Sequence, residues 1–462
     1  MTREEAQKIL DAGKETAIRK FQELSAEIDR LKALSPNSPT TPSGQIPLFL
    51  KDEKKKRRKK PGQKVGHKGT ARSRIRPEDV KKTVEHPLNE CPNCGKCLKD
   101  QTPQKRPRVI EDMPDFTVEN VCHVNERKWC PDCQAMVEAP LTEALPGSVI
   151  GIRLAVFSAF LHYFVGVSIN NIKRLLEISS GHVVSIGGMF HIWNRLANLL
   201  EGEYDEIGEK VKKSAVVKAD ETGWRIMGKL AWLWAFVGHN ACFYFIYPFR
   251  KTKAVRSFLG KTFAGTLICD FWGAYNELRA KFKQRCLYHL FTEFKKTDQK
   301  TASHSWKAWK KKMVRLLRDS LRLAKKFQIL PFSEYDQAKQ HLVSRLDDLI
   351  QLDSPDSNIK RLSKRLNRHR NEIFTFLENP NEISPFNNDA ERAIRPSVIL
   401  RKICQQNRSW KGARVQAILM TIFRTAHMEG KNPFETTLTL AKTAISHLKK
   451  PRNSDVELKI AA

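Results

Sequence analysis

The chain has 462 residues and carries 82 Lys and Arg against 50 Asp and Glu, a formal net charge of +32. Hydrophobic residues make up 40% of it, which is enough for packed cores and excludes a wholly disordered chain. The length predicts about three domains, and the charge favours a polyanionic partner, nucleic acid before an anionic membrane surface.

The N-terminal sequence and the cysteine pattern indicate a compartment. Met1–Lys20 is charged and lacks an apolar stretch, so we expect no secretory signal. Ser148–Ser168 is the most apolar segment, but Arg153 and His162 interrupt it, which favours a buried helix over a membrane span. Cysteines in C-x-x-C pairs without a signal favour metal binding over disulfides. We therefore expect a cytoplasmic, nucleoid-associated protein that is not bound to a membrane.

Residues 1–34 form the first predicted element, a helix. Leu10, Ala17, Leu24 and Leu31 are spaced by seven, which is the period of a coiled-coil stripe over about three heptads. The helix either dimerises the protein as a coiled coil or packs on its own chain.

Residues 35–88 are a linker followed by a basic arm. Ser35–Pro47 is rich in Ser, Pro and Thr, a composition typical of linkers. Consecutive like charges cannot pack together, so the basic block that follows is either a solvated tail or an arm that contacts phosphates, and the net charge favours the arm. The side chains that we expect to contact DNA here are Lys54, Lys55, Lys56, Arg57, Arg58, Lys59, Lys60, His67 and Lys68.

Residues 89–144 have the cysteine pattern of a zinc ribbon. The four thiols are Cys91, Cys94, Cys130 and Cys133. Two C-x-x-C knuckles can complete a tetrahedral S₄ zinc site, although redox or accidental pairing is the alternative. Phe116–Val124 alternates like a strand within the spacer. Cys97 is an alternative ligand or a spare thiol, and we expect Cys122 in the core.

Residues 145–210 are predicted to be helical. Ser168–Leu176, a turn at Ser179–Gly181 and Val183–Trp193 give the outline of a helix-turn-helix. The segment is either a DNA-binding unit or a plain helical subdomain.

Residues 211–300 predict a sheet that carries two acids. The predicted elements are, in chain order, strands at 214–220, 231–237 and 241–247, a helix at about 253–259, a strand at 265–269, a short helix at 274–280 and a strand at 284–288. Asp220 ends the first strand and Asp270 follows the fourth. This order outlines the first part of an RNase H-like core.

A third acid is expected after a helical insertion at 301–380. The insertion carries a helical apolar stripe, which we expect in a core, and its basic opposite face is a candidate DNA surface. The stripe consists of Trp306, Trp309, Met313, Leu316, Leu317, Ser320, Leu321, Ala324 and Phe327. Residues 381–430 then complete the core: we expect Asp389 to cap a helix and Glu391 to lie in its first turn. Residues 431–462 form a C-terminal helix and tail.

Three carboxylates in this arrangement have a chemical use. Two Mg²⁺ ions about 3.5–4 Å apart need shared anionic oxygen ligands to activate a water or a 3′-hydroxyl and to stabilise the leaving oxygen. Each of these acids alone would be a cap or a solvated charge.

Several motifs occur in a fixed order along the chain. They are GQKVGHKG at 62–69, the paired C-x-x-C, ADETGWRI at 219–226, WLWAFV at 232–237, CDFWGAYN at 269–276, CLYH at 286–289, NNDAERAIRP at 387–396 and RKICQQNRSWKGA at 401–413. On these motifs the chain resembles insertion sequence 66 family transposases, which are DDE enzymes, over nearly its whole length.

The resemblance implies roles for named residues. Asp220, Asp270 and Glu391 would be the catalytic triad and would bind Mg²⁺ or Mn²⁺. Cys286 and His289 would be the C-x-x-H signature that follows the second Asp in several DDE families, and we expect them to support the fold or position a phosphate rather than ligate metal. Leu290–Thr292 displaces the basic residue often found soon after that His. The side chains that would face phosphates, or else be solvated helix charges, are Arg392, Arg395, Arg401 and Lys402.

The sequence therefore predicts a multidomain α+β protein: an N-terminal helix, a zinc ribbon, and an RNase H-like α/β core with a helical insertion. We expect a metal-dependent DNA transposase that recognises terminal inverted repeats, frees a 3′-hydroxyl at each element end and joins it to target DNA. A homodimer or higher oligomer is expected in the synaptic complex, and a need for accessory proteins of the element stays open. The alternatives are a zinc-ribbon DNA-binding regulator, an RNase H-like nuclease or resolvase without strand transfer and, more weakly, a membrane-surface protein.

Overall fold

The structure of the protein is a computed structural model. It describes residues 117–138, 141–301 and 303–448, together with scattered residues between 17 and 97. The chain divides into two units, and the second, Ser38–Gly44 with Val118–Ala462, carries the elements below. Several predictions fall outside the described residues: most of the N-terminal helix at 1–34, the basic arm with Lys54–Lys60, His67 and Lys68, and the first zinc knuckle, Cys91 and Cys94.

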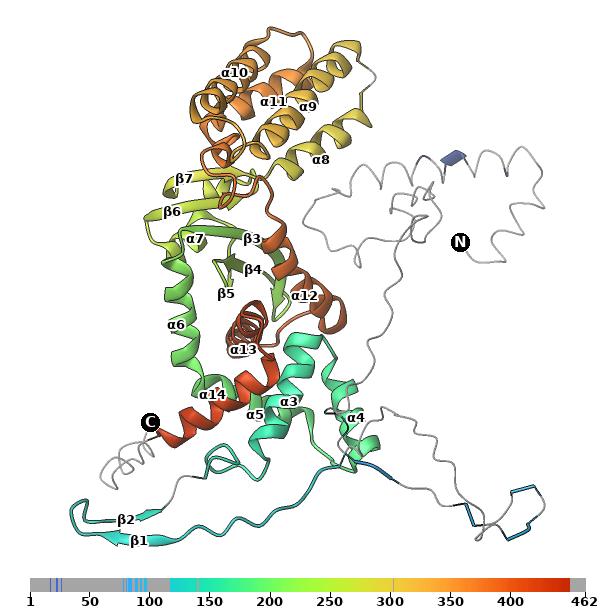
Figure 1. The fold of residues 1–462 in the computed structure, drawn as a ribbon, viewed down its shortest axis with the longest axis vertical. Coiled ribbons are helices and arrows are strands. Elements are labelled where there is room, and N and C mark those ends of the chain that lie inside the picture. Colours follow the sequence, from blue (N-terminus) through green and yellow to red (C-terminus); the bar gives the residue numbers. More distant parts are fainter. Residues whose placement is uncertain are drawn as a thin grey trace. The chain divides into compact units, whose positions relative to one another are not determined.

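A five-stranded mixed sheet lies at the centre of this unit (Figure 1). Its strands are β3 (Val216–Ile226), β4 (Lys229–Val237), β5 (Cys242–Tyr247), β6 (Thr262–Cys269) and β7 (Arg279–Arg285), in the order β5-β4-β3-β6-β7. β3, β4 and β5 pair antiparallel, whereas β6 is parallel to both β3 and β7. The sequence prediction of three strands, a helix and a returning strand is confirmed, with α7 (Thr252–Leu259) as the crossover.

Two glycines allow this sheet to form. The β3–β4 hairpin turns through Met227 and Gly228, which both have positive φ, as a two-residue turn between twisted strands requires. Gly265 sits at an irregularity between β6 and β7, where a Cβ would lie 2.6 Å from the carbonyl oxygen of Ala215. A side chain there would push β6 away from the chain that enters β3.

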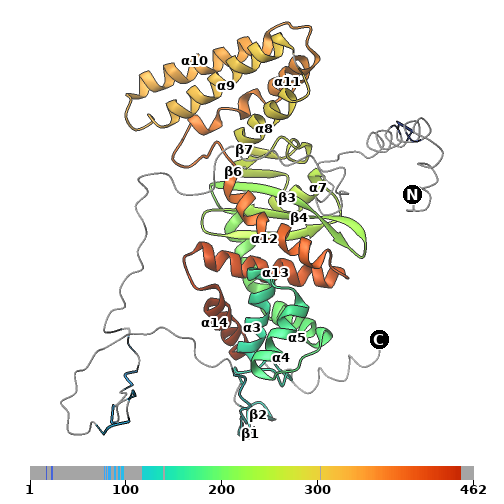
Figure 2. The same ribbon diagram turned by 90° about the vertical axis from the view of Figure 1, so that its right-hand side faces the viewer.

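Helices cover both faces of the sheet. The helices α12 (Asn388–Cys404) and α13 (Trp410–Met428) lie on one face (Figure 2). Tyr244 of β5 fixes them, because its hydroxyl donates to the carbonyl of Ala393 at 2.7 Å and its N–H donates to Thr421 Oγ1 at 3.0 Å. On the other face, Phe258 of α7 stacks on Phe243 with a centroid distance of 4.5 Å.

A helical region precedes the sheet and packs with the C-terminal helix. Its elements are α3 (Ile152–Phe160), the π-helix η3 (Leu161–Val165), α4 (Ile169–Ser180), α5 (Ile186–Leu199) and α6 (Glu201–Lys212), and α14 (Pro433–Ser446) packs on α3, α5 and α13. The helix, turn and helix predicted here are confirmed: α4 ends at Gly181, which has φ +66°, and the Ser185 hydroxyl caps α5. In the described part of the chain, no helix is both long and apolar enough to cross a membrane.

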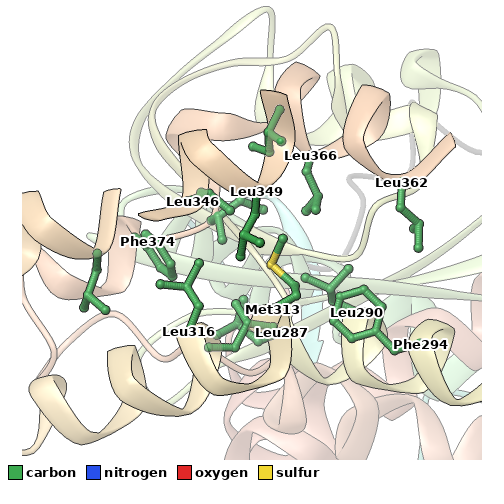
Figure 3. Packing of buried hydrophobic residues seen from close by; sticks show 14 of the residues in the cluster. Leu287, Leu290, Phe294, Met313, Leu316, Leu346, Leu349, Leu362, Leu366 and Phe374 are labelled. Atoms are coloured by element: carbon green, nitrogen blue, oxygen red, sulfur yellow. The ribbon is translucent and has the colours of Figure 1, made fainter. Parts of the chain in front are cut away.

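The helical insertion has its own core (Figure 3). Its elements are α8 (Leu287–Asp298), α9 (His304–Ala324), α10 (Phe332–Gln351), α11 (Ser357–Arg368) and the 3₁₀ turns η5 (Arg370–Glu372) and η6 (Thr375–Leu377). The predicted stripe is confirmed, because Trp306, Trp309 and Met313 are fully buried while Leu321, Ala324 and Phe327 pack at its margin. The insertion starts earlier than predicted, since α8 already contributes Leu287, Leu290 and Phe294 to this core.

Several local predictions are wrong. The helix expected at 274–280 is only a 3₁₀ turn, η4 (Gly273–Tyr275), and β7 starts and ends earlier than the strand expected at 284–288. Cys286 therefore ends no strand but is the N-cap residue of α8. Described residues of Phe116–Val124 form no strand, because none of them pairs in a ladder, and Cys122 is exposed rather than in a core. The short hairpin β1 (Arg127–Cys130) and β2 (Ala135–Glu138) follows instead.

Candidate active site

The first candidate acid, Asp220, lies within β3 and faces α12. It does not end the strand as predicted, because β3 continues to Ile226. Side chains alternate along a strand, so Asp220 shares its face with Lys218, whose ammonium pairs with the first turn of α12. Burial raises the pKa of Asp220 well above its usual range, and the negative charges of Glu221, Asp270 and Glu391 raise it further. The other two acids predicted from the sequence, Asp270 and Glu391, thus lie within electrostatic reach of Asp220.

The second acid, Asp270, follows the last residue of β6, directly beside β3 in the sheet. The backbone N–H of Trp272 donates to Asp270 Oδ1 at 2.8 Å. The guanidinium of Arg285 donates through Nη1 to the carbonyl oxygen of Asp270 at 2.7 Å. Both the carboxylate and the backbone of this residue are therefore held in place.

The third acid, Glu391, lies in the first turn of α12, as predicted. The side chain of Asn387, the residue before the helix, donates to the carbonyl of Ala219 at 2.8 Å and ties the helix start to β3. The predicted cap is wrong: Asn387 occupies the N-cap position, and Asp389 forms an ion pair with Lys218 instead. That ion pair is a second tie between α12 and β3.

This crowding of acids fits a divalent cation. A buried carboxylate whose pKa is raised by neighbouring carboxylates either holds a proton or shares a cation with them. Asp220, Asp270 and Glu391 offer oxygen donors only, the type of ligand that Mg²⁺ and Mn²⁺ prefer.

A fourth acid, Glu221, lies on the opposite face of β3 and was not predicted. Its carboxylate accepts from Arg250 Nε at 2.7 Å and from the hydroxyl of Tyr275. The guanidinium of Arg250 lies between two indoles, 4.8 Å from the Trp232 ring and 3.9 Å from the Trp272 ring. Burial raises the pKa of Glu221 to about 7. The sequence offered one signal for Glu221. It directly follows Asp220 in a strand, so its side chain lies on the opposite face, which is buried.

A fully buried arginine, Arg285, was also not predicted. Besides the Asp270 carbonyl, it donates to Asn276 Oδ1 at 2.9 Å and to Glu372 Oε2 at 2.6 Å. Burial opposes ionisation of Glu372, but the hydrogen bond from His369 and the charge of Arg285 lower its pKa to about 2. This network joins the loop of the second acid to the end of the helical insertion. A basic residue at the end of a strand gives no sequence signal of such a role.

The C-x-x-H pair lies against the third acid. Cys286 is buried, burial raises the pKa of its thiol, and its Sγ accepts from the N–H of Asn387 at 3.3 Å. His289 Nδ1 lies 3.9 Å from Glu391 Oε1. Donor atoms of Cys286, His289 and Glu391 all lie within 4.8 Å of one another.

The second C-x-x-C pair lies at the tip of the β1–β2 hairpin. Cys130 ends β1 and Cys133 lies in the turn, so the hairpin places both thiols together. Hydrogen bonds from Cys133 lower the pKa of Cys130, which favours the thiolate that a metal requires. Cys97 is exposed.

The basic residues of α12 fall into two kinds. Arg392, Arg395 and Lys402 are exposed, and Arg392 also lines a cavity of about 770 Å³ between β3, α12 and α13. Arg401 is half-buried and donates to Thr222 Oγ1 at 3.0 Å, so it braces α12 against β3.

A comparison with protein families gives a match over the central part of the chain. The family model described as Transposase IS66 family matches residues 147–415, more than half of the 462-residue chain. The match covers the sheet, the helical insertion and α12. No curated protein matches the chain.

Proposed function

Because the chain belongs to the IS66 family of transposases, we propose that it cleaves and joins DNA with Asp220, Asp270 and Glu391 as a metal-binding triad. The observation that supports this most strongly is the placement of three acids from β3, β6 and α12 so close that two of them raise the pKa of the third. The sheet order β5-β4-β3-β6-β7 is the one expected of an RNase H-like core.

The residues of the chain would bind and orient the reacting groups. The three carboxylates would hold Mg²⁺ or Mn²⁺, which when bound lowers the pKa of an attacking hydroxyl and stabilises the leaving oxygen. Asp270 would keep one orientation because Trp272 and Arg285 hold its side chain and backbone. Exposed Arg392 would neutralise phosphate charge beside Glu391.

Two reactions of phosphodiester bonds would take place at this site, a hydrolysis and then a transesterification. First, a water oxygen attacks the phosphorus at an element end, the bond from phosphorus to the 3′-oxygen breaks, and that oxygen leaves as a 3′-hydroxyl. The 3′-hydroxyl then attacks a target phosphorus and displaces a target 3′-oxygen. No covalent intermediate with the protein is formed.

DNA recognition would use the parts outside the sheet. We propose that the zinc ribbon, the basic arm and the α4–α5 pair bind the inverted repeats. The hairpin that presents Cys130 and Cys133 supports the ribbon, and capped α4 and α5 support the helix-turn-helix. Zinc analysis tests the ribbon: Cys130→Ser should lose one zinc per chain, and unchanged zinc content would reject it.

Cleavage of an end-labelled element terminus in Mg²⁺ tests the catalytic proposal. Wild type should cut the fragment, Asp270→Ala should not, and the control Glu277→Ala, whose side chain is 65% exposed, should cut like wild type. If wild type cuts no better than Asp270→Ala, the proposal fails.

Joining of a pre-cut 3′ end to a plasmid separates a transposase from a nuclease without strand transfer. Wild type should form joined product, and Asp270→Ala should not. Cleavage without any joining would instead assign the nuclease alternative.

A further inference from the structure

The C-x-x-H pair and the third acid form a mixed donor group at the meeting point of two helix starts. Cys286 precedes α8, His289 lies in the first turn of α8, and Glu391 lies in the first turn of α12. Their donor atoms, one sulfur, one nitrogen and one oxygen, lie within 4.8 Å of one another. We propose that these three residues bind a zinc ion.

Unpartnered polar atoms support a cation site at this place. His289 Nδ1 and Glu391 Oε1 are both buried, and in the described structure neither has a hydrogen-bond partner. Buried polar atoms are nearly always paired, since leaving one unpaired costs about 1–3 kcal/mol. The two atoms are 3.9 Å apart, too far for a hydrogen bond but suited to an ion between them. One cation would satisfy both.

The ligand types select the metal. Thiolate, imidazole and carboxylate together suit Zn²⁺, whereas Mg²⁺ takes oxygen ligands. Zinc bonds of about 2.0–2.3 Å would bring these donors together by side-chain movements of about 1 Å. Three protein ligands leave the fourth position of a tetrahedral ion for water.

The surroundings provide support and access. The N–H of Asn387 donates to the sulfur of Cys286, a contact that stabilises a thiolate ligand. The side chains of His289 and Glu391 are 39% and 36% exposed, so an ion can enter from solvent.

Zinc binding here would compete with the catalytic metal. Glu391 belongs to both donor sets, and a carboxylate turned toward His289 and Cys286 is withdrawn from Asp220 and Asp270. Zinc would therefore inhibit Mg²⁺-dependent cleavage. This consequence rests on the proposed function, whereas zinc binding itself does not.

Zinc content of the full chain tests the site without any activity assay. After equilibration with zinc and desalting, wild type should carry one more zinc per chain than Cys286→Ser, whatever the ribbon holds. The matched control is Cys404→Ser, a half-buried thiol outside this group, which should equal wild type. Equal zinc in wild type and Cys286→Ser would overturn the proposal.

A second variant separates the loss of zinc from a loss of the fold. His289→Asn changes a partly exposed ring, and it should lose the same single zinc with an unchanged circular dichroism spectrum. If His289→Asn keeps its full zinc, the proposal fails even where Cys286→Ser is unfolded.

A zinc titration at fixed Mg²⁺ tests the inhibition. Cleavage by wild type should fall as zinc rises, and His289→Asn should need at least about tenfold more zinc for the same fractional loss of its own rate. Equal sensitivity would overturn the inhibitory role. Absence of cleavage by wild type even without zinc would instead refute the proposed function and leave the zinc count to decide the site.

Discussion

Replacing Arg285 with methionine should destabilise the protein far more than replacing a surface arginine. The guanidinium is fully buried and donates to Glu372, Asn276 and the carbonyl of Asp270. Glu372 titrates at about 2 rather than about 4.3, so its charged and hydrogen-bonding partners contribute about 3 kcal/mol near neutral pH. Removing one member of such a buried pair costs about 3–5 kcal/mol. We expect Arg285→Met to lose that much unfolding free energy.

Urea unfolding of the full chain at pH 7 measures this loss. The control is Arg322→Met, whose side chain is 72% exposed in an ion pair with Asp319, and which should cost less than about 1 kcal/mol. A depressed acid pKa stabilises the fold above about pH 4.3 and ceases to do so as pH falls toward 2. The gap between wild type and Arg285→Met should therefore shrink over that range. Equal costs for Arg285→Met and Arg322→Met would refute the reasoning.

The conservative variant separates charge from geometry. Arg285→Lys keeps a positive charge but lacks the planar fork that reaches three acceptors at once. It should recover part of the stability, because Glu372 regains a cation. It should still lower the rate of DNA cleavage, because the loop of Asp270 loses a donor. A lysine variant with the wild-type rate would show that the Asp270 carbonyl contact does not position the second acid.

Three further predictions concern other regions. Burial lowers the pKa of His162 to about 4, so below about pH 6.5 the unfolded state binds a proton that the folded state does not. Between pH 7 and 5 the unfolding free energy of wild type, and of the exposed control His341→Gln, should therefore fall by about 2 kcal/mol relative to that of His162→Gln, a comparison in which the opposite effect of the raised Glu221 pKa cancels. Trp306→Ala should cost about 3–5 kcal/mol in urea unfolding, because a fully buried indole leaves a cavity in the insertion core. In DNA binding measured at several salt concentrations, Arg392→Ala should reduce the salt slope by about one, whereas Arg401→Ala should leave it unchanged because that guanidinium is bonded to β3.

Regular hydrophobic patterns account for the parts of the fold that were predictable. The stripe through Trp306 and Met313 has the helical period and is buried from Trp306 to Ser320. The apolar run that ends at Asp220, and the strand that leads to Asp270, predicted two sheet positions that the structure brings side by side. These elements are long enough for local sequence to specify both the type and the buried face.

Contacts distant in sequence account for what could not be predicted. Gln284–Tyr288 carries no periodicity that distinguishes strand from helix. α8 starts within it at Leu287, whose N–H donates to the carbonyl of Pro385 at 2.9 Å, a contact about 100 residues away in the sequence. Charged residues are rarely buried, so sequence statistics place Arg285 and Glu221 on the surface. Their partners, Glu372 and Arg250, come from separate elements that only the folded chain brings together.

Contacts between the two ends of the helical insertion explain why so long an insertion does not disturb the candidate site. Between the second and third acids the chain runs from 270 to 391, yet the two ends of the insertion meet. The N–H of Leu287 donates to the carbonyl of Pro385, and the N–H of Asn387 donates to the sulfur of Cys286. The side chain of Asn387 donates to the carbonyl of Ala219, the residue before the first acid. Glu391 is therefore positioned by β3 and by the start of α8, not by the length of the helices between them. A packed insertion on closed ends can present basic helix faces to DNA while the position of Glu391 is set by these contacts at its base.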